Sequence, residues 1–442
     1  VTTGQFTIPL MKRFGYSSAF AGGVEATSSM GGQIMPPVMG AVAFIMSETI
    51  NVPYIEICKA ALIPALLYFI TAFWMVHLEA GHKGLLGLSK EECPNPWTAV
   101  RERWFLLLPL VGLVGLLFSG YTPLFSGTVG LGLTAILIFG AAVLTGVKGL
   151  ALRALFWVLL GFACAGFFKF GVGTFFVIVA LLVALTYIRR TGGDARRLAV
   201  RALVEGARHA LPVAIACALV GVIIGVINLT GVAAELGGHI IAVGQKSLFL
   251  ALLLTMVTCL VLGMGIPTIP NYIITSSLAA PVLLQLGVPL IVSHMFVFYF
   301  GIMADLTPPV ALAAFAAAPI ARESGLKISL QAVRVAIAGF IVPFMAVYTP
   351  ALMLQGGDWM DTSYVVLKAL LAIAMWGAGA IGFLFGPLNW FERIVTIAAA
   401  SFLVAALPMT DEIGFGAIAL FVAWHVWRTR GKPGQTVSAT PH

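Results

Sequence analysis

Long apolar runs follow one another along the chain, separated by short polar segments. Most approach the ~18–20 residues that an α-helix needs to cross a bilayer. Because the runs are continuous and lack period-2 alternation, they predict membrane helices and not a β-barrel. The expected fold class is therefore an all-α polytopic membrane protein. The expected spans lie at about 54–78, 104–119, 128–147, 153–170, 172–188, 210–228, 247–264, 272–286, 289–303, 309–321, 331–353, 364–385, 391–407 and 412–427.

Composition and charge placement agree with this pattern. The chain of 442 residues is 60% hydrophobic and 10% charged, whereas soluble proteins carry roughly 25% charged residues. The net charge of +8 does not indicate nucleic acid, because the basic residues cluster at the ends of apolar runs. This placement follows the positive-inside rule and predicts that those loops and the C-terminus are cytoplasmic. The residues concerned are Arg189, Arg190, Arg196, Arg197, Arg201, Arg208, Arg428, Arg430 and Lys432.

Two interrupted segments repeat each other. One is GGQIMPPVMGAVAFIM, Gly31 to Met46, and the other is ADLTPPVALAAFAAAPIA, Ala304 to Ala321. Aligning their Pro-Pro-Val steps gives an offset of 308 − 36 = 272 residues, which places Gln33 on Asp305. Because proline breaks or kinks a helix interior, each step predicts a broken membrane helix.

A third interruption lies at 247–287, where two apolar arms flank GMGIPTIPN. We expect a re-entrant hairpin whose tip lies at membrane depth. Such a backbone is tolerated only where it is buried in protein or lines a cavity.

Paired interrupted segments in corresponding halves of a chain indicate the binding site of a secondary transporter. Helix N-termini at the breaks would bind an anion. Side-chain and unwound backbone oxygens would bind a hard cation such as Na⁺. The candidate substrate- and ion-binding residues are Ser28, Ser29, Gly31, Gly32, Gln33, Pro36, Pro37, Gly263, Gly265, Thr268, Asn271, Asp305, Thr307, Pro308 and Pro309. The candidate Na⁺ ligands among them are Ser29, Gly32, Gly263, Thr268, Asp305 and Thr307.

Simpler interpretations stay open beside this one. A lone Pro-Pro step is more often a packing feature than a site. Asp305 would also serve as a cap for a helix that starts at Thr307-Pro308. Glu25 and Glu48 fit either a membrane interface or a functional role. The chain has no HExxH, GxSxG or Walker A motif and no CxxC among its 5 cysteines, so neither an enzyme, a cofactor nor direct use of ATP is indicated.

The motif-bearing stretches resemble a known family. They are VTTGQFTIPLMKRFGYSSAFAGGVEATSSMGGQIMPPVMGAVAFIMSE, LGMGIPTIPNYIITSSLAAPVLLQLGVP and FVFYFGIMADLTPPVALAAFAAAPIA. They are similar to the large membrane subunit of TRAP (tripartite ATP-independent periplasmic) transporters, most of all the fused permeases of the TAXI branch. The resemblance implies an inverted-repeat, elevator-type fold of the ion transporter superfamily in a bacterial inner membrane.

The resemblance also implies ion-coupled uptake of organic acids, with Na⁺ or alternatively H⁺ as the coupling ion. The partners it implies are a periplasmic TAXI-type substrate-binding protein and a small membrane subunit. In the family, the tip of a first hairpin would precede Val1, so we expect an N-terminally truncated chain whose small subunit is also encoded upstream. The alternatives are a passive anion channel, or an ion-coupled carboxylate transporter that works without a binding protein.

The expected organisation divides the chain into six parts. Residues 1–50 form the first-repeat segment with its broken helix, 51–192 form scaffold and connecting spans, and 193–246 form an amphipathic interfacial helix followed by second-repeat scaffold. Residues 247–330 form the second hairpin and second broken helix, 331–428 form C-terminal spans, and 429–442 form a disordered tail.

Overall fold

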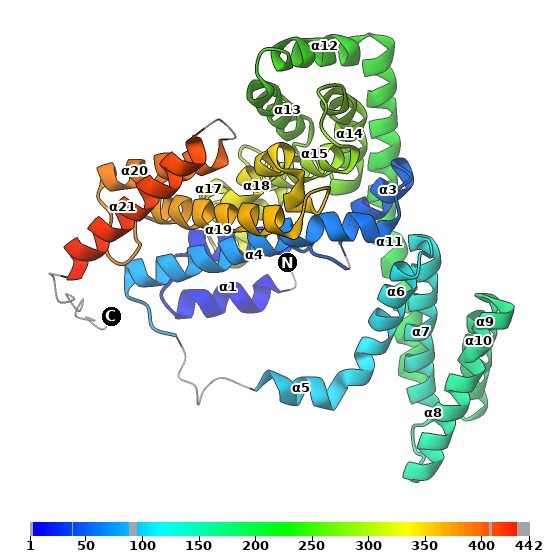
Figure 1. Ribbon diagram of the computed structural model, residues 1–442. Helices are drawn as coiled ribbons and strands as arrows, with labels where there is room; N and C mark the ends of the chain where they lie inside the picture. Colours follow the sequence, from blue (N-terminus) through cyan, green and yellow to red (C-terminus); the bar gives the residue numbers. More distant parts are fainter. Residues whose placement is uncertain (1–2, 38, 88–94, 406–408, 431–442) are drawn as a thin grey trace. The chain divides into compact units, whose positions relative to one another are not determined.

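The computed structural model describes residues 3–37, 39–87, 95–405 and 409–430. Of the tail predicted at 429–442, residues 429 and 430 belong to α21 and the rest lies outside the described residues. The described chain is built from α-helices and two short 3₁₀ helices (Figure 1), which confirms the all-α class. By length and composition, four described helices can cross a membrane, or five if one bent pair counts as a span. They are α4 (Tyr54–Lys83), α7 (Pro123–Val143), α11 (Gly193–Leu229), α19 (Trp359–Ile381) and the pair α17 (Gly325–Val335) with α18 (Ile337–Tyr348).

The chain divides into two compact units. The smaller unit comprises Pro53–Ile55 and Lys90–Ile215. Within it α7 packs against α6 (Leu108–Phe118) and α10 (Gly173–Ile188), around a core that includes Val129, Ile136 and Ile178. The remaining helices here are α5 (Pro96–Arg103), η1 (Trp104–Leu107), α8 (Leu150–Ala165) and α9 (Phe167–Phe170). Four apolar runs expected between 104 and 188 thus appear as α6, α7, α8 and α10.

One predicted boundary was wrong. We expected an interfacial helix at 193–208 and a separate span at 210–228, but α11 is one continuous helix from Gly193 to Leu229. Gly206 and Pro212 stand on either side of ARHAL, and the helix continues through both of them.

The larger unit comprises Val1–Val52, Glu56–Ser89 and Ala216–His442. Its helices reproduce the 272-residue offset. Shifting α2 (Ser18–Gly31) by this offset gives 290–303, and α15 spans Leu290–Ala304. Shifting α3 (Ala41–Thr49) gives 313–321, and α16 spans Leu312–Ala321. The Pro36-Pro37 and Pro308-Pro309 bonds are both cis.

The two related segments contact each other reciprocally. Under the same offset, α1 (Gly4–Arg13) corresponds to the second half of α14 (Thr268–Gln285), and Pro9 of α1 falls on Pro281 of α14. Helix α1 packs against α16, and α14 packs against α3. Helix α1 of the first segment therefore contacts the broken helix of the second, and α14 of the second segment contacts the broken helix of the first. A two-fold relation between the segments would produce this exchange.

The related segments also run in opposite directions past α19. Trp74 of α4 donates a hydrogen bond to the Ala374 carbonyl (3.1 Å), and Gly81 lies against the Phe383 ring, so α4 runs parallel to α19. Shifting α4 by 272 residues gives the α17–α18 pair, which bends by 42°. Arg334 of this pair donates to the Ala380 carbonyl near the end of α19, whereas Ala351, just after the pair, accepts a bond from Thr362 near its start. The pair therefore runs antiparallel to α19.

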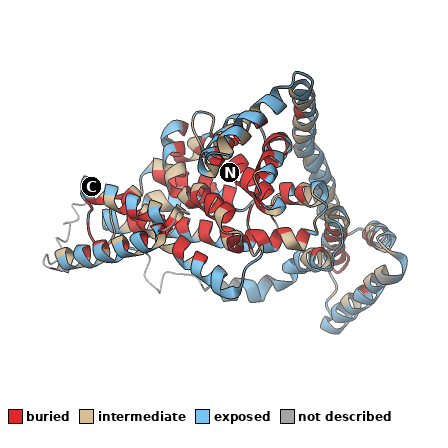
Figure 2. Ribbon diagram, turned by 45° about the horizontal axis from the view of Figure 1, so that its top comes forward, coloured by how far each residue is buried: buried red, intermediate tan, exposed pale blue. Residues whose placement is uncertain are grey.

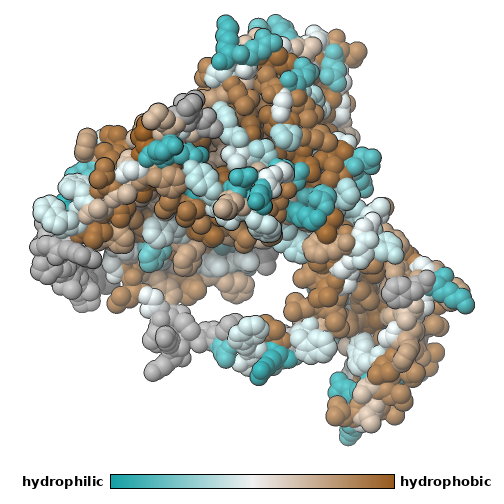
Figure 3. All heavy atoms as spheres, in the orientation of Figure 1, coloured by the Kyte–Doolittle hydropathy of each residue, from teal (hydrophilic) through white to brown (hydrophobic). Residues whose placement is uncertain are grey.

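The outer surface of the helices is apolar. Buried residues, red in Figure 2, concentrate in the larger unit. Hydrophobic side chains cover much of the visible outer surface (Figure 3), and among the exposed ones are Phe73, Leu124, Phe162 and Leu420, each at least 74% accessible. This distribution suits helices that face lipid, where apolar exposure carries no penalty. The larger unit also contains α12 (Val232–Gly244), α13 (Leu248–Leu262), η2 (Pro350–Met353), α20 (Trp390–Val404) and α21 (Thr410–Arg430).

Candidate functional site

The predicted hairpin packs directly on the end of α15. Its arms are α13 and α14, and its tip is the five-residue segment 263–267 between them. The Asn271 side chain, one turn into α14, donates a hydrogen bond to the Gly301 carbonyl of α15 (2.8 Å). A Cβ atom on Gly263 would lie 2.5 Å from Asn271 Nδ2 and 2.8 Å from the Ala304 side chain. Only glycine therefore fits at this close approach between the hairpin and α15.

Asp305 begins the second break, directly after α15. Its backbone carbonyl accepts a hydrogen bond from the Ala313 amide across the break (3.1 Å), which holds the loop together. The residue is buried, with only 5% of its surface exposed. The capping interpretation of Asp305 was wrong. The following helix, α16, begins at Leu312 and not at Thr307, and it has no side-chain cap at Ala311.

Two buried oxygen atoms where the hairpin meets the end of α15 have no hydrogen-bond partner among the described residues, namely Asp305 Oδ1 and Asn271 Oδ1. Tyr299 Oη, earlier on α15, is also buried without a partner among them. Buried polar atoms are nearly always paired, so such a group requires a physical reason. Carboxylate, amide and hydroxyl oxygens are the donors that a hard cation prefers. Tyr299 was not predicted from the sequence, where its only signal is a hydroxyl in the apolar run that precedes Asp305.

Other predicted residues complete this region. Thr307 Oγ1 donates to the Met303 carbonyl (2.7 Å), which leaves its lone pairs available. A Cβ atom on Gly265 would come within 3.3 Å of Val310, so the hairpin tip lies against the second break. Thr268 is the first residue of α14. The structure thus brings together the predicted residues of the hairpin tip and the second break.

The first break is also closed by a backbone hydrogen bond, but its span and its side chains differ. The Gly40 amide donates to the Gln33 carbonyl seven residues earlier (2.9 Å), whereas the Ala313 amide donates to the Asp305 carbonyl eight residues earlier. The Gln33 side chain folds back onto Gly40, where an added Cβ atom would lie 3.3 Å from it, and Gly31 faces the Tyr68 ring of α4. Ser28 is half-buried, whereas Ser29 and Gly32 are exposed. Contact with the hairpin comes through α3, which packs against α14.

A carboxylate also lies near the first break, but its oxygens are occupied. Glu25 of α2 is 9% exposed. It accepts hydrogen bonds from the hydroxyls of Thr3 and Thr7, which tie α1 to α2, and a longer one from Ser29 (3.5 Å). Glu48, the other ambiguous acid, is exposed near the end of α3. The cluster of hydroxyls around Glu25 was not predicted from the sequence.

The helices that begin at the breaks lack side-chain caps. The residues before α3, α14 and α16 are Gly40, Pro267 and Ala311, and none provides a capping hydrogen bond. Some other helices of the same unit also lack a side-chain cap, for example α12 and α17, whereas α13 is capped by Ser247 and α20 by Asn389. No lysine or arginine occurs at 18–50 or 263–321. An anion at the breaks would therefore be bound by backbone N–H groups and helix dipoles.

Broken helices and a helical hairpin with buried oxygen atoms, in a chain with several helices long and apolar enough to cross a membrane, are typical of membrane transport proteins. Residues 1–357 match the family described as "Tripartite ATP-independent periplasmic transporter, DctM component". The chain belongs to this family, whose members are transporter permeases and not enzymes. A relative, the "Sialic acid TRAP transporter large permease protein SiaM" of Vibrio cholerae serotype O1, is 29% identical over 121 residues, which are 27% of this chain and 28% of that protein.

Proposed function

We propose that this permease carries an organic acid into the cell by sodium-coupled, elevator-type transport. The substrate is delivered by a periplasmic binding protein of the TAXI type, and a small membrane subunit completes the transporter. The tripartite organisation follows the family description. The TAXI assignment is based on the wording of the motif-bearing stretches at 1–48 and 262–321.

The relation between the two segments supports an inverted-repeat fold. Corresponding helices share the 272-residue offset, and α4 and the α17–α18 pair run in opposite directions past α19. In inverted-repeat transporters, substrate and ions bind at discontinuous helices near the bilayer midplane. The two Pro-Pro breaks and the hairpin tip are the discontinuities of this chain, and they support placing the site there.

The chemistry of the breaks favours an anionic substrate. Three helices, α3, α14 and α16, begin there without side-chain caps. Their first N–H groups have no partner within the helix, so they can bind a carboxylate. Because no basic side chain lies at 18–50 or 263–321, a single carboxylate is a better match than a multiply charged anion.

The single observation that carries the sodium proposal is the buried Asp305 carboxylate, whose Oδ1 has no hydrogen-bond partner among the described residues. Asn271 Oδ1 is also unpartnered there, and the Asn271 amide lies against α15, where it donates to the Gly301 carbonyl. A bound Na⁺ would satisfy oxygens of this kind and would compensate a carboxylate that is costly at membrane depth. Proton binding to the same carboxylate is the alternative form of coupling.

The test uses the full-length transporter with its small subunit in proteoliposomes. Uptake of labelled carboxylic acids is measured in the presence of the purified binding protein encoded beside this chain. We expect uptake to need an inward sodium gradient and to stop when a sodium ionophore collapses it. Uptake that instead follows a proton gradient would contradict sodium coupling. Uptake that is indifferent to both gradients would indicate a passive channel, and uptake without a binding protein would indicate a two-component carboxylate transporter.

A further inference from the structure

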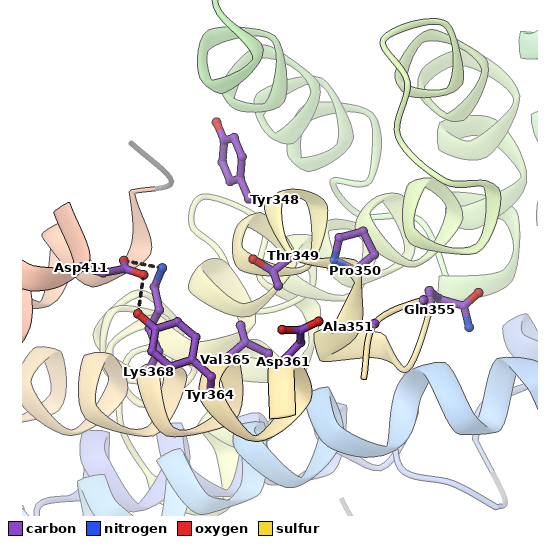
Figure 4. Close-up of a pocket in the computed structure, with 12 residues that line it drawn as sticks. Tyr348, Thr349, Pro350, Ala351, Gln355, Asp361, Tyr364, Val365, Lys368 and Asp411 are labelled. Carbon is purple, nitrogen blue, oxygen red and sulfur yellow. Dashed lines mark hydrogen bonds and ion pairs between the residues drawn. The ribbon is translucent and has the colours of Figure 1, made fainter. Parts of the chain in front are cut away.

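A pocket of about 340 Å³ lies within the larger unit, at the junction of α18, η2, α19 and α21. Helices α19 to α21 follow the family-matched residues 1–357, so this part of the chain has no role assigned by the family match. Figure 4 shows Tyr364 and Lys368 of α19 pointing toward Asp411 at the start of α21. Asp361 lies one turn earlier on the same face of α19 and also lines the pocket.

The base of the pocket holds a buried ion pair. Lys368 Nζ lies 2.6 Å from Asp411 Oδ1, and its side chain is only 9% exposed. Tyr364 Oη donates to the other Asp411 oxygen (2.8 Å). Lys368 is nine residues after the start of α19, which places its Cα about 13–14 Å along the helix. Ionisable groups held this far inside a membrane helix mark functional sites by default, because their burial is costly.

The pocket carries a net negative charge. Two carboxylates, Asp361 and Asp411, and one ammonium group, Lys368, line it. Lys368 and Tyr364 already engage Asp411. The Asp361 carboxylate has only a long hydrogen bond (3.4 Å) from the Asp358 amide. Asp361 is therefore the group that remains available, and a cationic guest would compensate its charge.

The pocket lies at the start of α19, whereas a group of arginines lies at the other end of that helix. Arg334 and Arg393 donate to the carbonyls of Ala380 and Gly379 at the end of α19. Arg428, at the end of α21, donates to Pro387 nearby. The positive-inside rule places this basic end in the cytoplasm. The beginning of α19, with Asp358 and Asp361, therefore faces the opposite, periplasmic side.

We propose that this pocket receives a lysine or arginine side chain of the periplasmic binding protein, so that the C-terminal helices form part of its docking surface. This inference rests on the proposed function, which requires such a partner on that side. Trp359 and Met360 in the first turn of α19 are 78% and 79% exposed. Aromatic residues and methionine are enriched at protein interfaces. A charged residue anchored in a pocket beside them is a common form of binding hot spot.

The test measures the affinity between the purified binding protein and the full-length transporter in nanodiscs. Asp361→Asn removes the available charge without changing the side-chain shape, and we expect roughly tenfold weaker binding. The matched control is Glu412→Gln, which removes one charge from an exposed residue at the same end of α21 that does not line the pocket. We expect it to change affinity by less than about twofold.

A charge exchange sharpens the test. Asp361→Lys should abolish binding, and reversing one lysine or arginine of the binding protein to glutamate should restore it. If Asp361→Asn and Glu412→Gln lose the same affinity for the binding protein, the effect is one of general charge. That result would contradict the proposal that this pocket receives a basic side chain. A different outcome would also contradict the proposal. If Asp361→Asn binds the partner as tightly as the parent chain does, while agmatine changes Trp359 fluorescence in the parent chain but not in Asp361→Asn, then a free organic cation occupies the pocket instead. If the parent chain does not bind the binding protein, the proposed function fails together with this inference.

Discussion

The first and second breaks are built alike but differ in their chemistry. Each joins two helices through a cis Pro-Pro step and a backbone hydrogen bond that crosses the loop. Near the first break, the acid Glu25 is surrounded by hydroxyl donors from Thr3, Thr7 and Ser29. At the second break, Asp305 Oδ1 is buried without a hydrogen-bond partner among the described residues. Of these two acids, Asp305 is therefore the one whose carboxylate is open to an ion.

The largest effect is expected for Asp305→Asn. This change keeps the size of the side chain but removes the charge that a cation needs. We expect the sodium concentration for half-maximal uptake to rise by at least roughly a hundredfold, a loss of ~2.7 kcal/mol in binding. Initial uptake rates over a sodium series measure this. The matched change in the first break, Gln33→Glu, should leave the sodium dependence within about threefold; a comparable loss there would remove the distinction between the breaks.

The next largest effect is expected for Gly263→Ala. An added Cβ atom would meet Asn271 Nδ2 at 2.5 Å and Ala304 at 2.8 Å, so the hairpin must move away from α15. Overpacking of this kind costs about 1–3 kcal/mol. We expect sodium affinity to fall roughly tenfold, measured by the same uptake series. The control is Gly32→Ala, whose Cβ would meet only the Ser29 carbonyl, at 3.3 Å. Equal effects of the two substitutions would contradict the close fit at Gly263.

A smaller effect, of a different kind, is expected for Glu25→Ala. The change removes the carboxylate that accepts from Thr3 and Thr7. Because the Thr7 hydroxyl keeps its bond to the Thr3 carbonyl and Thr3 is exposed, the folded state should lose only about 1 kcal/mol of stability. Thermal unfolding of the purified protein measures this loss. Uptake per folded molecule should keep its sodium dependence, since the Glu25 oxygens are already occupied by these hydroxyls. If Glu25→Ala loses the sodium dependence of uptake but keeps its stability, the ion site would have to lie at the first break.

The smallest effect is expected for Thr307→Val. The Thr307 hydroxyl donates to Met303, so it can offer a cation only a lone pair. Losing one neutral oxygen ligand should raise the sodium requirement by about threefold, from ~0.5–1 kcal/mol of lost interaction. Thr307→Ser keeps the hydroxyl and should behave like the parent in the uptake series. A hundredfold change in Thr307→Val would make this hydroxyl a principal ligand rather than an auxiliary one.

Much of the architecture could be predicted from hydrophobic runs and repeated prolines. The Pro-Pro steps located both breaks, and GMGIPTIPN located the hairpin tip, because proline and glycine interrupt helices through local backbone properties. Asp305 was also found, since an acid in an apolar run is conspicuous. The continuity of α11 through Pro212 was missed, because a proline kink and a helix end leave similar sequence signals.

The side-chain partners could not be predicted in the same way. The pairing of Glu25 with Thr3 and Thr7 depends on how α1 packs against α2. The ion pair between Lys368 and Asp411 joins two residues that are 43 positions apart in sequence, on different helices. Neither contact has a local pattern that reports it. Tyr299 was overlooked because nothing in its sequence neighbours reports that its hydroxyl is buried without a partner among the described residues.

The most direct test of the ion site measures how sodium stabilises the purified full-length protein, with potassium as the reference salt. A ligand that binds only the folded state raises the free energy of unfolding by about 2.7 kcal/mol at a hundred times its Kd. We predict a sodium-specific rise in Tm for the parent protein and for Gln33→Glu, and no such rise for Asp305→Asn. A sodium-specific rise of equal size in Asp305→Asn would contradict the assignment of the ion site to the second break.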